Sequence, residues 1–131
     1  MSAYGPASGL ATDWLKLFTN GSPGSYSAWY AQLHTGYPGA SGTSNVSTTT
    51  TRPTVAWGTA SAGSVSASGS PCFQWTSWAG SSGEVDTALS LWSASTSGTF
   101  YDCLALGSSV TMYTGDTLQV TTLTISFTLA S

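Results

Sequence analysis

Residues 30–45 read Tyr-Ala-Gln-Leu-His-Thr-Gly-Tyr-Pro-Gly-Ala-Ser-Gly-Thr-Ser-Asn, a run of mostly large side chains followed by turn residues. The first six positions favour a β-strand, which Gly36 ends. The tripeptide Tyr37-Pro38-Gly39 predicts a turn, because proline fixes φ and glycine accepts a positive φ. A second strand-like run follows at 52–57. The stretch therefore predicts the first connection of an all-β domain.

The same alternation of strand-like runs and Gly/Ser clusters continues to the end of the chain. We predict further strands at 64–67, 72–76, 85–93, 99–106, 110–112, 117–120 and 123–129. Turn signals about every 8–12 residues, with no alternating helices, are typical of a sandwich or small barrel. The predicted fold is all-β, an antiparallel β-sandwich with jelly-roll-like or related topology over residues 25–131.

Side-chain alternation assigns the faces of these strands. Leu89 and Leu91 fall on the expected core face together with Val85, and Asp86 and Trp92 fall on the opposite face. The apolar positions of 118–120 and 123–129 have opposite parity, which predicts a bulge or reversal at 121–122 and a shared apolar face that includes Phe127 and Leu129. The threonine-rich tract 44–51 has no apolar face and predicts an edge strand or an ordered loop.

Residues 1–24 follow a different period and predict an arm and a short helix, distinct from the sandwich at 25–131. Apolar side chains recur there at helical spacing: Leu10, Trp14, Leu17 and Phe18. Ser8 or Thr12 is the expected cap, and Asn20-Gly21 is the expected stop. A helix this short is marginal alone, so its apolar side must pack on the sandwich or on a neighbouring protein.

Composition limits the classes of partner. Charged residues make up 5% of the chain, and Lys16 and Arg52 are its only basic side chains, so no basic patch for nucleic acid can form. The chain opens with no signal-peptide pattern and has no run of about 20 apolar residues. We therefore expect synthesis in the cytoplasm and no insertion into a membrane. Six Trp, six Tyr and four Phe favour a folded core over disorder.

The candidates for chemistry are few. His34 is the only histidine, and no serine lies in a nucleophile-elbow motif, so a catalytic triad is not indicated. Glu84 and Asp86 share one strand face, where solvated charges that discourage edge pairing explain them better than a hydrolytic pair does. We therefore predict no catalytic residue and no enzyme activity.

The metal ligands and thiols give no recognisable site either. Cys72, Cys103 and His34 lack zinc-site spacing, and a calcium site from Asp86, Asp102 and Asp116 is the weaker alternative to ordinary strand and turn positions. We predict neither a metal nor a cofactor. The two cysteines are expected as buried thiols, with a disulfide between them as the open alternative.

Aromatic side chains are the remaining candidates for function, because one small core cannot bury all of them. They suit two roles: anchors at a contact with another protein, or a platform on which sugar rings stack. The candidate contact residues are Leu10, Trp14, Phe18, Trp29, Tyr37, Trp78 and Trp92.

Several of these stretches resemble small tail-fibre-like or decoration-type virion structural proteins of tailed bacteriophages. The similarity covers about residues 29–131 and includes the strand and loop at 30–45, Arg52, Ala-Leu-Ser-Leu-Trp at 88–92 and Gly-Asp-Thr-Leu at 115–118. It implies a non-enzymatic protein on the outside of the virion, at the tail tip, fibre or capsid surface. Such a protein is made in the host cytoplasm and is present in multiple copies.

The partners implied are other virion proteins and copies of the same chain, with a host surface glycan as a further candidate. The alternative function is a carbohydrate-binding module that uses exposed aromatic residues. A third, a small secreted accessory protein of a hydrolase, is disfavoured because no signal peptide opens the chain.

Overall fold

The computed structural model describes residues 4–19, 21–22 and 24–127. That part of the chain contains one helix and seven strands: α1 (Ser8–Lys16), β1 (Tyr30–His34), β2 (Ser64–Ser66), β3 (Phe73–Trp75), β4 (Glu84–Trp92), β5 (Phe100–Met112), β6 (Leu118–Val120) and β7 (Thr124–Ser126). All paired strands are antiparallel. The prediction of an all-β fold with one short N-terminal helix is confirmed.

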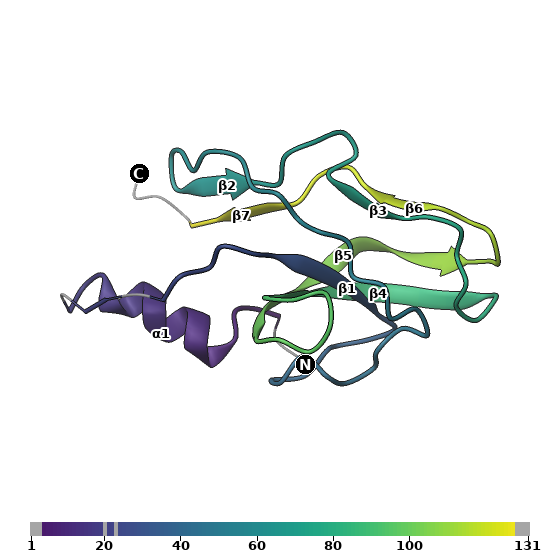
Figure 1. Cartoon of the computed structure of the whole chain (residues 1–131), viewed down its shortest axis with the longest axis horizontal. Helices are drawn as coiled ribbons and strands as arrows, with labels where there is room; N and C mark the ends of the chain where they lie inside the picture. Colours follow the sequence, from purple (N-terminus) through teal and green to yellow (C-terminus); the bar gives the residue numbers. More distant parts are fainter. Residues whose placement is uncertain (1–3, 20, 23, 128–131) are drawn as a thin grey trace.

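The strands form one three-stranded sheet and two short ribbons. The sheet has the order β1-β4-β5, and the ribbons are β2-β7 and β3-β6. Figure 1 shows the two ribbons in one layer and the sheet in a second layer, with α1 at the end of the molecule where β2 and β7 lie. The two ribbons share the C-terminal part of the chain, because β6 runs into β7 through residues 121–123. The irregularity predicted at 121–122 is thus an interruption between two strands with different partners, rather than the expected bulge or reversal.

The β4-β5 pairing is irregular, which corrects the prediction of two separate strands at 99–106 and 110–112. β5 is continuous, but Asp86 pairs with Val110 whereas Ala88 pairs with Ala105. Residues 106–109 of β5 lie opposite Thr87 alone, an excess of three residues that is accommodated at this register shift, as in a β-bulge. Gly107 and its serine neighbours therefore interrupt the ladder without ending the strand.

The outer edge of β1 is covered by irregular backbone. The amides of Ala31 and Thr35 donate to the carbonyls of Pro53 and Asn45, at 3.0 and 2.8 Å. The strand predicted at 52–57 is wrong in its extent, since this segment makes only isolated bridges. Pro53 has no N–H to offer, which limits a regular ladder there. The tract 44–51 is an ordered loop that makes one bridge, between Val46 and His34.

The faces of β4 agree with prediction only in part. Leu89 and Leu91 lie in the core at 3% and 0% exposure, as expected. Val85 is 43% exposed, whereas Asp86 and Trp92 of the opposite face are buried. β4 is the central strand of its sheet, and loops cover its second face near Trp92, so strict inside-outside alternation does not apply.

The ends of the chain also differ from expectation. β7 ends at Ser126, and Phe127 is 60% exposed, so its assignment to the core was wrong; Leu129 lies outside the described residues. The N-cap of α1 is Ala7, with no side-chain cap, rather than Ser8 or Thr12. The arm before it is bonded to β5, since the Ala7 amide donates to the Tyr101 carbonyl at 2.7 Å.

The core fills the space between the two layers and extends under α1. Its buried hydrophobic residues are Leu10, Ala31, Leu33, Val55, Phe73, Trp75, Trp78, Leu89, Leu91, Tyr101, Met112 and Leu123. The helix thus contributes Leu10 to the same core as the strands. Among the described residues, no helix has the length and apolar character required to cross a membrane.

Candidate functional site: an apolar groove beside the helix

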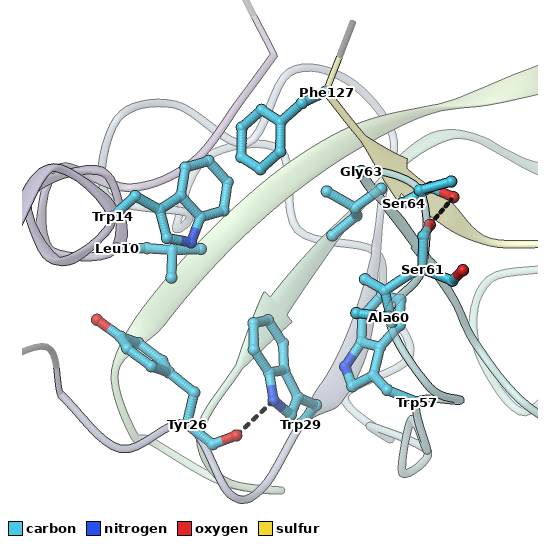
Figure 2. Close-up of a pocket in the computed structure, with 13 residues that line it drawn as sticks. Leu10, Trp14, Tyr26, Trp29, Trp57, Ala60, Ser61, Gly63, Ser64 and Phe127 are labelled. Atoms are coloured by element: carbon cyan, nitrogen blue, oxygen red, sulfur yellow. Dashed lines mark hydrogen bonds between the residues drawn. The ribbon is translucent and has the colours of Figure 1, made fainter. Parts of the chain in front are cut away.

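An apolar groove of about 490 Å³ lies between α1 and the ribbon β2-β7. Figure 2 shows Leu10 and Trp14 pointing into it from α1, with Trp57 and Ser61 on the facing wall. No charged side chain lines it. The lining residues are Leu10, Trp14, Tyr26, Trp29, Trp57, Ala60, Ser61, Ala62, Gly63, Ser64, Val65, Ile125 and Phe127. A groove of this kind receives apolar groups.

Asp13 fixes the helical wall of the groove. Its carboxylate accepts hydrogen bonds from Lys16 Nζ at 2.5 Å, from the Gly24 amide at 2.9 Å and from the Tyr26 hydroxyl. The bonds from Lys16 and Tyr26 lower the pKa of Asp13 to about 2, and the bond to Asp13 raises the pKa of Tyr26 to about 12. α1 is therefore tied to the segment that leads into β1 at every physiological pH.

Two aromatic contacts and one hydrogen bond shape the walls. Trp14 and Phe127 meet edge to face with ring centroids 5.3 Å apart, and Trp29 and Trp57 do so at 5.6 Å. The Trp29 indole N–H donates to the Tyr26 carbonyl at 2.8 Å. The Trp57 indole nitrogen is buried without a hydrogen-bond partner among the described residues, and Figure 2 shows it on the side toward Trp29. The rings are thus held by one another and by the backbone.

The facing wall is a tight turn before β2. Ser61 and Ser64 exchange backbone hydrogen bonds at 2.9 and 3.0 Å, and the chain turns between them through Ala62 and Gly63, which have φ of 48° and 74°. The Gly63 carbonyl accepts the Phe127 amide at 2.8 Å, which joins this turn to the end of β7. Both walls are therefore built from ordered backbone.

Apolar side chains at the C-terminal end of α1 are left in solvent. Leu15 is 63% exposed, and Leu17 and Phe18, which follow the end of α1, are 70% and 87% exposed. Sequence periodicity placed Leu17 and Phe18 on the packed side of the helix. The α-helix ends at Lys16, however, so these two residues leave the helical face that Leu10 and Trp14 occupy.

The seven candidate contact residues separate into three groups. Leu10, Trp14 and Trp29 line the groove, and Phe18, from the turn that follows the same helix, is exposed. Trp78 and Trp92 are 2% and 6% exposed, which corrects their expected place on the surface. Tyr37 is half-buried in a different place, against Tyr4 at 5.3 Å between centroids.

The sequence did not lead us to propose Tyr26, Trp57, Ser61 or Phe127 as contact residues. Tyr26 lies in a Gly/Ser linker, and the pairing of β2 with β7, which brings the other walls together, leaves no periodic signal. The abundance of aromatic residues was the only available clue to this groove.

His34 is buried, and both of its ring nitrogens have hydrogen-bond partners. Its Nδ1 lies 2.8 Å from the Ser44 carbonyl, which can only accept, so Nδ1 carries the proton. Nε2 then accepts from Ser90 Oγ at 2.7 Å, and Ser90 Oγ accepts from Trp92 Nε1 at 2.7 Å. Burial lowers the pKa of His34. Because His34 and Ser90 are both 0% exposed, this pair presents no nucleophile to a substrate.

Arg52 completes the same region. Its guanidinium lies 4.2 Å from the centroid of Trp92 and donates to Gln32 Oε1 at 2.8 Å. It also donates to the carbonyls of Ala94 and Ser97, at 3.2 and 2.7 Å, which holds the β4-β5 loop against the sheet. We call His34, Arg52, Ser90 and Trp92 the polar network.

The other residues considered for chemistry do not gather. No group of three His, Cys, Asp or Glu side chains in the described ranges is arranged to hold a metal ion. Asp116 accepts the Tyr113 amide at 2.9 Å within a turn. Cys72 and Cys103 are both free thiols, Cys103 buried and Cys72 half-buried, and burial raises the pKa of Cys103. The alternative of a disulfide is therefore wrong.

A known protein family matches most of the chain. Residues 7–128 match the model of the family described as "Podophage GP4 fiber I protein gp80". The matched range includes α1, every described strand and all the residues that line the groove. No curated protein matches the chain significantly.

Proposed function

The chain belongs to the family of the podophage GP4 fiber I protein gp80, a family of phage tail-fibre-like structural proteins, and we propose that it is a non-enzymatic fibre subunit on the exterior of the virion. In this proposal it is present in multiple copies, and protein–protein contacts hold it in place. The contact surface consists of the groove beside α1 and the exposed side chains of Leu15, Leu17 and Phe18.

Two observations carry the proposal: an open apolar groove lies beside α1, and apolar side chains at the end of the same helix stay in solvent, Phe18 at 87% exposure. A buried aromatic side chain removes about 150–250 Å² from water, so Phe18 is an unused source of binding energy in the isolated chain. Adjacent exposed apolar groups of this kind mark contact sites on soluble proteins.

A second copy of the chain is the partner that this surface fits. Among the described residues no charged side chain lines the groove, and Lys16, which lies between Leu15 and Leu17, is paired with Asp13, so neither surface opposes the other electrostatically. The area that a stable interface buries indicates that both the groove and the exposed side chains take part in the contact. A stable interface buries about 800 Å² per partner, which three side chains do not reach unless the groove walls are covered too. A larger area is buried when the exposed side chains of each copy cover the groove of the other copy.

A carbohydrate-binding role is the second candidate, because five aromatic side chains line the groove. Two of their polar groups are already bonded within the chain, however: the Tyr26 hydroxyl to Asp13 and the Trp29 indole to the Tyr26 carbonyl. The Trp57 indole nitrogen has no partner among the described residues, but it is buried. These side chains therefore offer sugar hydroxyls few accessible partners in exchange for the water that they would lose. The groove therefore suits an apolar side chain better than a sugar.

Counting the chain in purified particles tests the proposal, combined with a variant that fills the groove. Ser61→Trp places a large side chain in the groove and leaves the backbone bonds to Ser64 intact. Ser108→Trp is the matched control, on an exposed part of β5 away from the groove. We expect the wild-type and control chains in several copies per particle, and the Ser61→Trp chain folded but depleted at least tenfold.

Two results would contradict this. Absence of the wild-type chain from particles would refute the virion assignment, and equal incorporation of both variants would refute the groove as the contact. Oligosaccharide binding that quenches tryptophan fluorescence in the wild type and is lost in Ser61→Trp would favour the carbohydrate-binding alternative.

A further inference from the structure

Two carboxyl groups at the start of β4 have opposite surroundings. Glu84 and Asp86 are two residues apart on one strand and therefore face the same way. Glu84 accepts hydrogen bonds from Ser47 Oγ at 2.5 Å, from Thr48 Oγ1 at 2.6 Å and from the Thr48 amide at 3.1 Å. Asp86 is 0% exposed, and neither of its oxygens has a hydrogen-bond partner among the described residues.

An ionised Asp86 in this position would be costly, because a buried carboxylate without donors loses its hydration and gains nothing in return. Ser47 lies close enough to Asp86 to lower its pKa, but its single hydroxyl proton is donated to Glu84 at 2.5 Å, so it does not also satisfy Asp86. Either a cation or a proton must therefore neutralise the group. A cation fits poorly: the donors around Glu84 are arranged for an anion, and in the described ranges no third acidic, His or Cys side chain completes a metal site.

We propose that Asp86 is held in its protonated form beside an ionised Glu84, and that this single proton keeps the segment Ser47–Thr48 latched to the start of β4. The two carboxyl groups then carry one negative charge, which Ser47 and Thr48 solvate. Loss of the proton places two negative charges on the same strand face and weakens the hold of Glu84 on the latch.

The electrostatics of the pair agree with this geometry. Burial and the charge of Glu84 raise the pKa of Asp86 from 3.8 to about 6. Burial also raises the pKa of Glu84, but the hydrogen bonds from Ser47 and Thr48 outweigh it, and the net shift is downward. Of the described titratable groups, Glu84 is the one whose charge acts on Asp86. The basic Arg52 is engaged with Gln32 and Trp92.

The sign of the pH dependence follows from the raised pKa. A carboxyl group with a higher pKa in the folded state stabilises that state below its unfolded pKa, and this stabilisation is lost as pH rises through the folded pKa. For Asp86 the window runs from 3.8 to about 6. The latch is therefore closed in mild acid and loosened at neutral pH.

The latch joins three parts of the fold. Thr48 Oγ1 accepts the Ser81 amide at 2.7 Å, which fixes the turn before β4. The Ser47 amide donates to the Leu33 carbonyl at 3.1 Å, which keeps the tract 44–51 along the edge of β1. Opening the latch would free this edge of β1 while leaving the core between the layers in place.

NMR of the full-length chain tests the proposal through two quantities, the ¹³C chemical shift of the Asp86 carboxyl group and the exchange rate of the Thr48 amide proton. The ¹³C shift of the Asp86 carboxyl should titrate with a midpoint near 6. Exchange of the Thr48 amide, corrected for its intrinsic pH dependence, should become about tenfold faster or more between mildly acidic and slightly alkaline buffer. A midpoint near 3.8 or unchanged Thr48 protection would overturn the proposal.

Variants separate this pair from the other buried carboxyl. Asp86→Asn keeps a neutral side chain beside Glu84 and should abolish the pH dependence at Thr48. Asp102→Asn is the control, because burial raises the pKa of Asp102 to about 6 as well, yet its carboxylate accepts its own neighbour's amide, Cys103 N, at 2.8 Å. That variant should keep the Thr48 response. A pH response that persists in Asp86→Asn would refute the proposal, and if Asp86→Asn fails to fold, the wild-type titration alone decides.

Discussion

Tryptophans occur both in the polar network on the outer face of the β1-β4-β5 sheet and in the groove beside α1. Their surroundings differ between the two regions. In the network, Trp92 is 6% exposed, its indole N–H is bonded to Ser90, and Arg52 covers its ring. In the groove, Trp14 and Trp29 border an open space of about 490 Å³. The polar groups of the network are paired within one chain, whereas the groove presents open apolar walls.

This difference separates residues that specify the fold from residues that can bind a partner. A buried network in which each donor meets an acceptor stabilises one arrangement of loops and offers nothing to a second molecule. An open apolar surface adds little to the stability of the isolated chain and gains free energy when another surface covers it. Mutations in the two regions should therefore affect different measurements.

The largest loss of stability is expected beneath the network, at Leu91. Leu91→Ala should lower the free energy of unfolding by about 2–5 kcal/mol, because this 0% exposed side chain leaves a cavity between the layers. Equilibrium unfolding in urea measures this change in the free energy of unfolding. Phe127→Ala, at a residue 60% exposed on the groove wall, should cost less than about 1 kcal/mol. Equal losses would show that the groove wall is as tightly packed as the core.

Ser90→Ala tests the network itself and should cost about 1–3 kcal/mol. The change removes the one group that joins His34 Nε2 to Trp92 Nε1, and both are then buried without a partner. Ser66→Ala is the control, since it removes an exposed hydroxyl bonded only to Thr124 Oγ1, and it should cost less than about 0.5 kcal/mol. If the two variants unfold alike, the network contributes no specific stability.

Arg52→Lys should cost about 1–2 kcal/mol, because a lysine keeps the charge but loses the planar fork that reaches Gln32 and the carbonyls of Ala94 and Ser97. Lys16→Arg, at the only other basic residue, should be nearly neutral. Thermal unfolding followed by near-ultraviolet circular dichroism of the tryptophans reports both. A stability of Arg52→Lys equal to wild type would mean that the β4-β5 loop is held by other contacts.

Much of the architecture could be predicted from local pattern. Glycine and proline positions, together with the alternation at Leu89 and Leu91, identified most strands and the core side of β4. The errors arose where tertiary contacts overrule alternation. Asp86 is buried beside a register shift, and Val85 is exposed although apolar. The position of a register shift depends on how two strands pair, so it cannot be predicted from the alternation of side chains within one strand.

The sites were less predictable because they depend on residues far apart in sequence. His34 meets Ser90 across 56 positions, and Glu84 meets Ser47 across 37. The threonine-rich tract looked interchangeable in sequence, yet Thr48 alone bonds both Glu84 and Ser81. Leu10, Trp14 and Trp29 could be proposed as contact residues from their type, but the groove that they share could not.

The smallest effect on stability and the largest on association is expected at Phe18. Phe18→Ser should change the free energy of unfolding by less than about 0.5 kcal/mol, because the side chain is 87% exposed. It should weaken self-association at least about tenfold, since burying such a side chain contributes about 1.5–3 kcal/mol. Tyr113→Ser is the matched control, an aromatic residue that is 57% exposed and does not line the groove.

Sedimentation velocity of the wild-type, Phe18→Ser and Tyr113→Ser chains over a range of concentrations tests most directly whether the apolar surface beside α1 is the contact between subunits. The account predicts concentration-dependent association of the wild type and of Tyr113→Ser, and monomers of Phe18→Ser at the same concentrations. A wild-type chain that stays monomeric throughout, or a Phe18→Ser chain that associates as strongly as Tyr113→Ser, would contradict it.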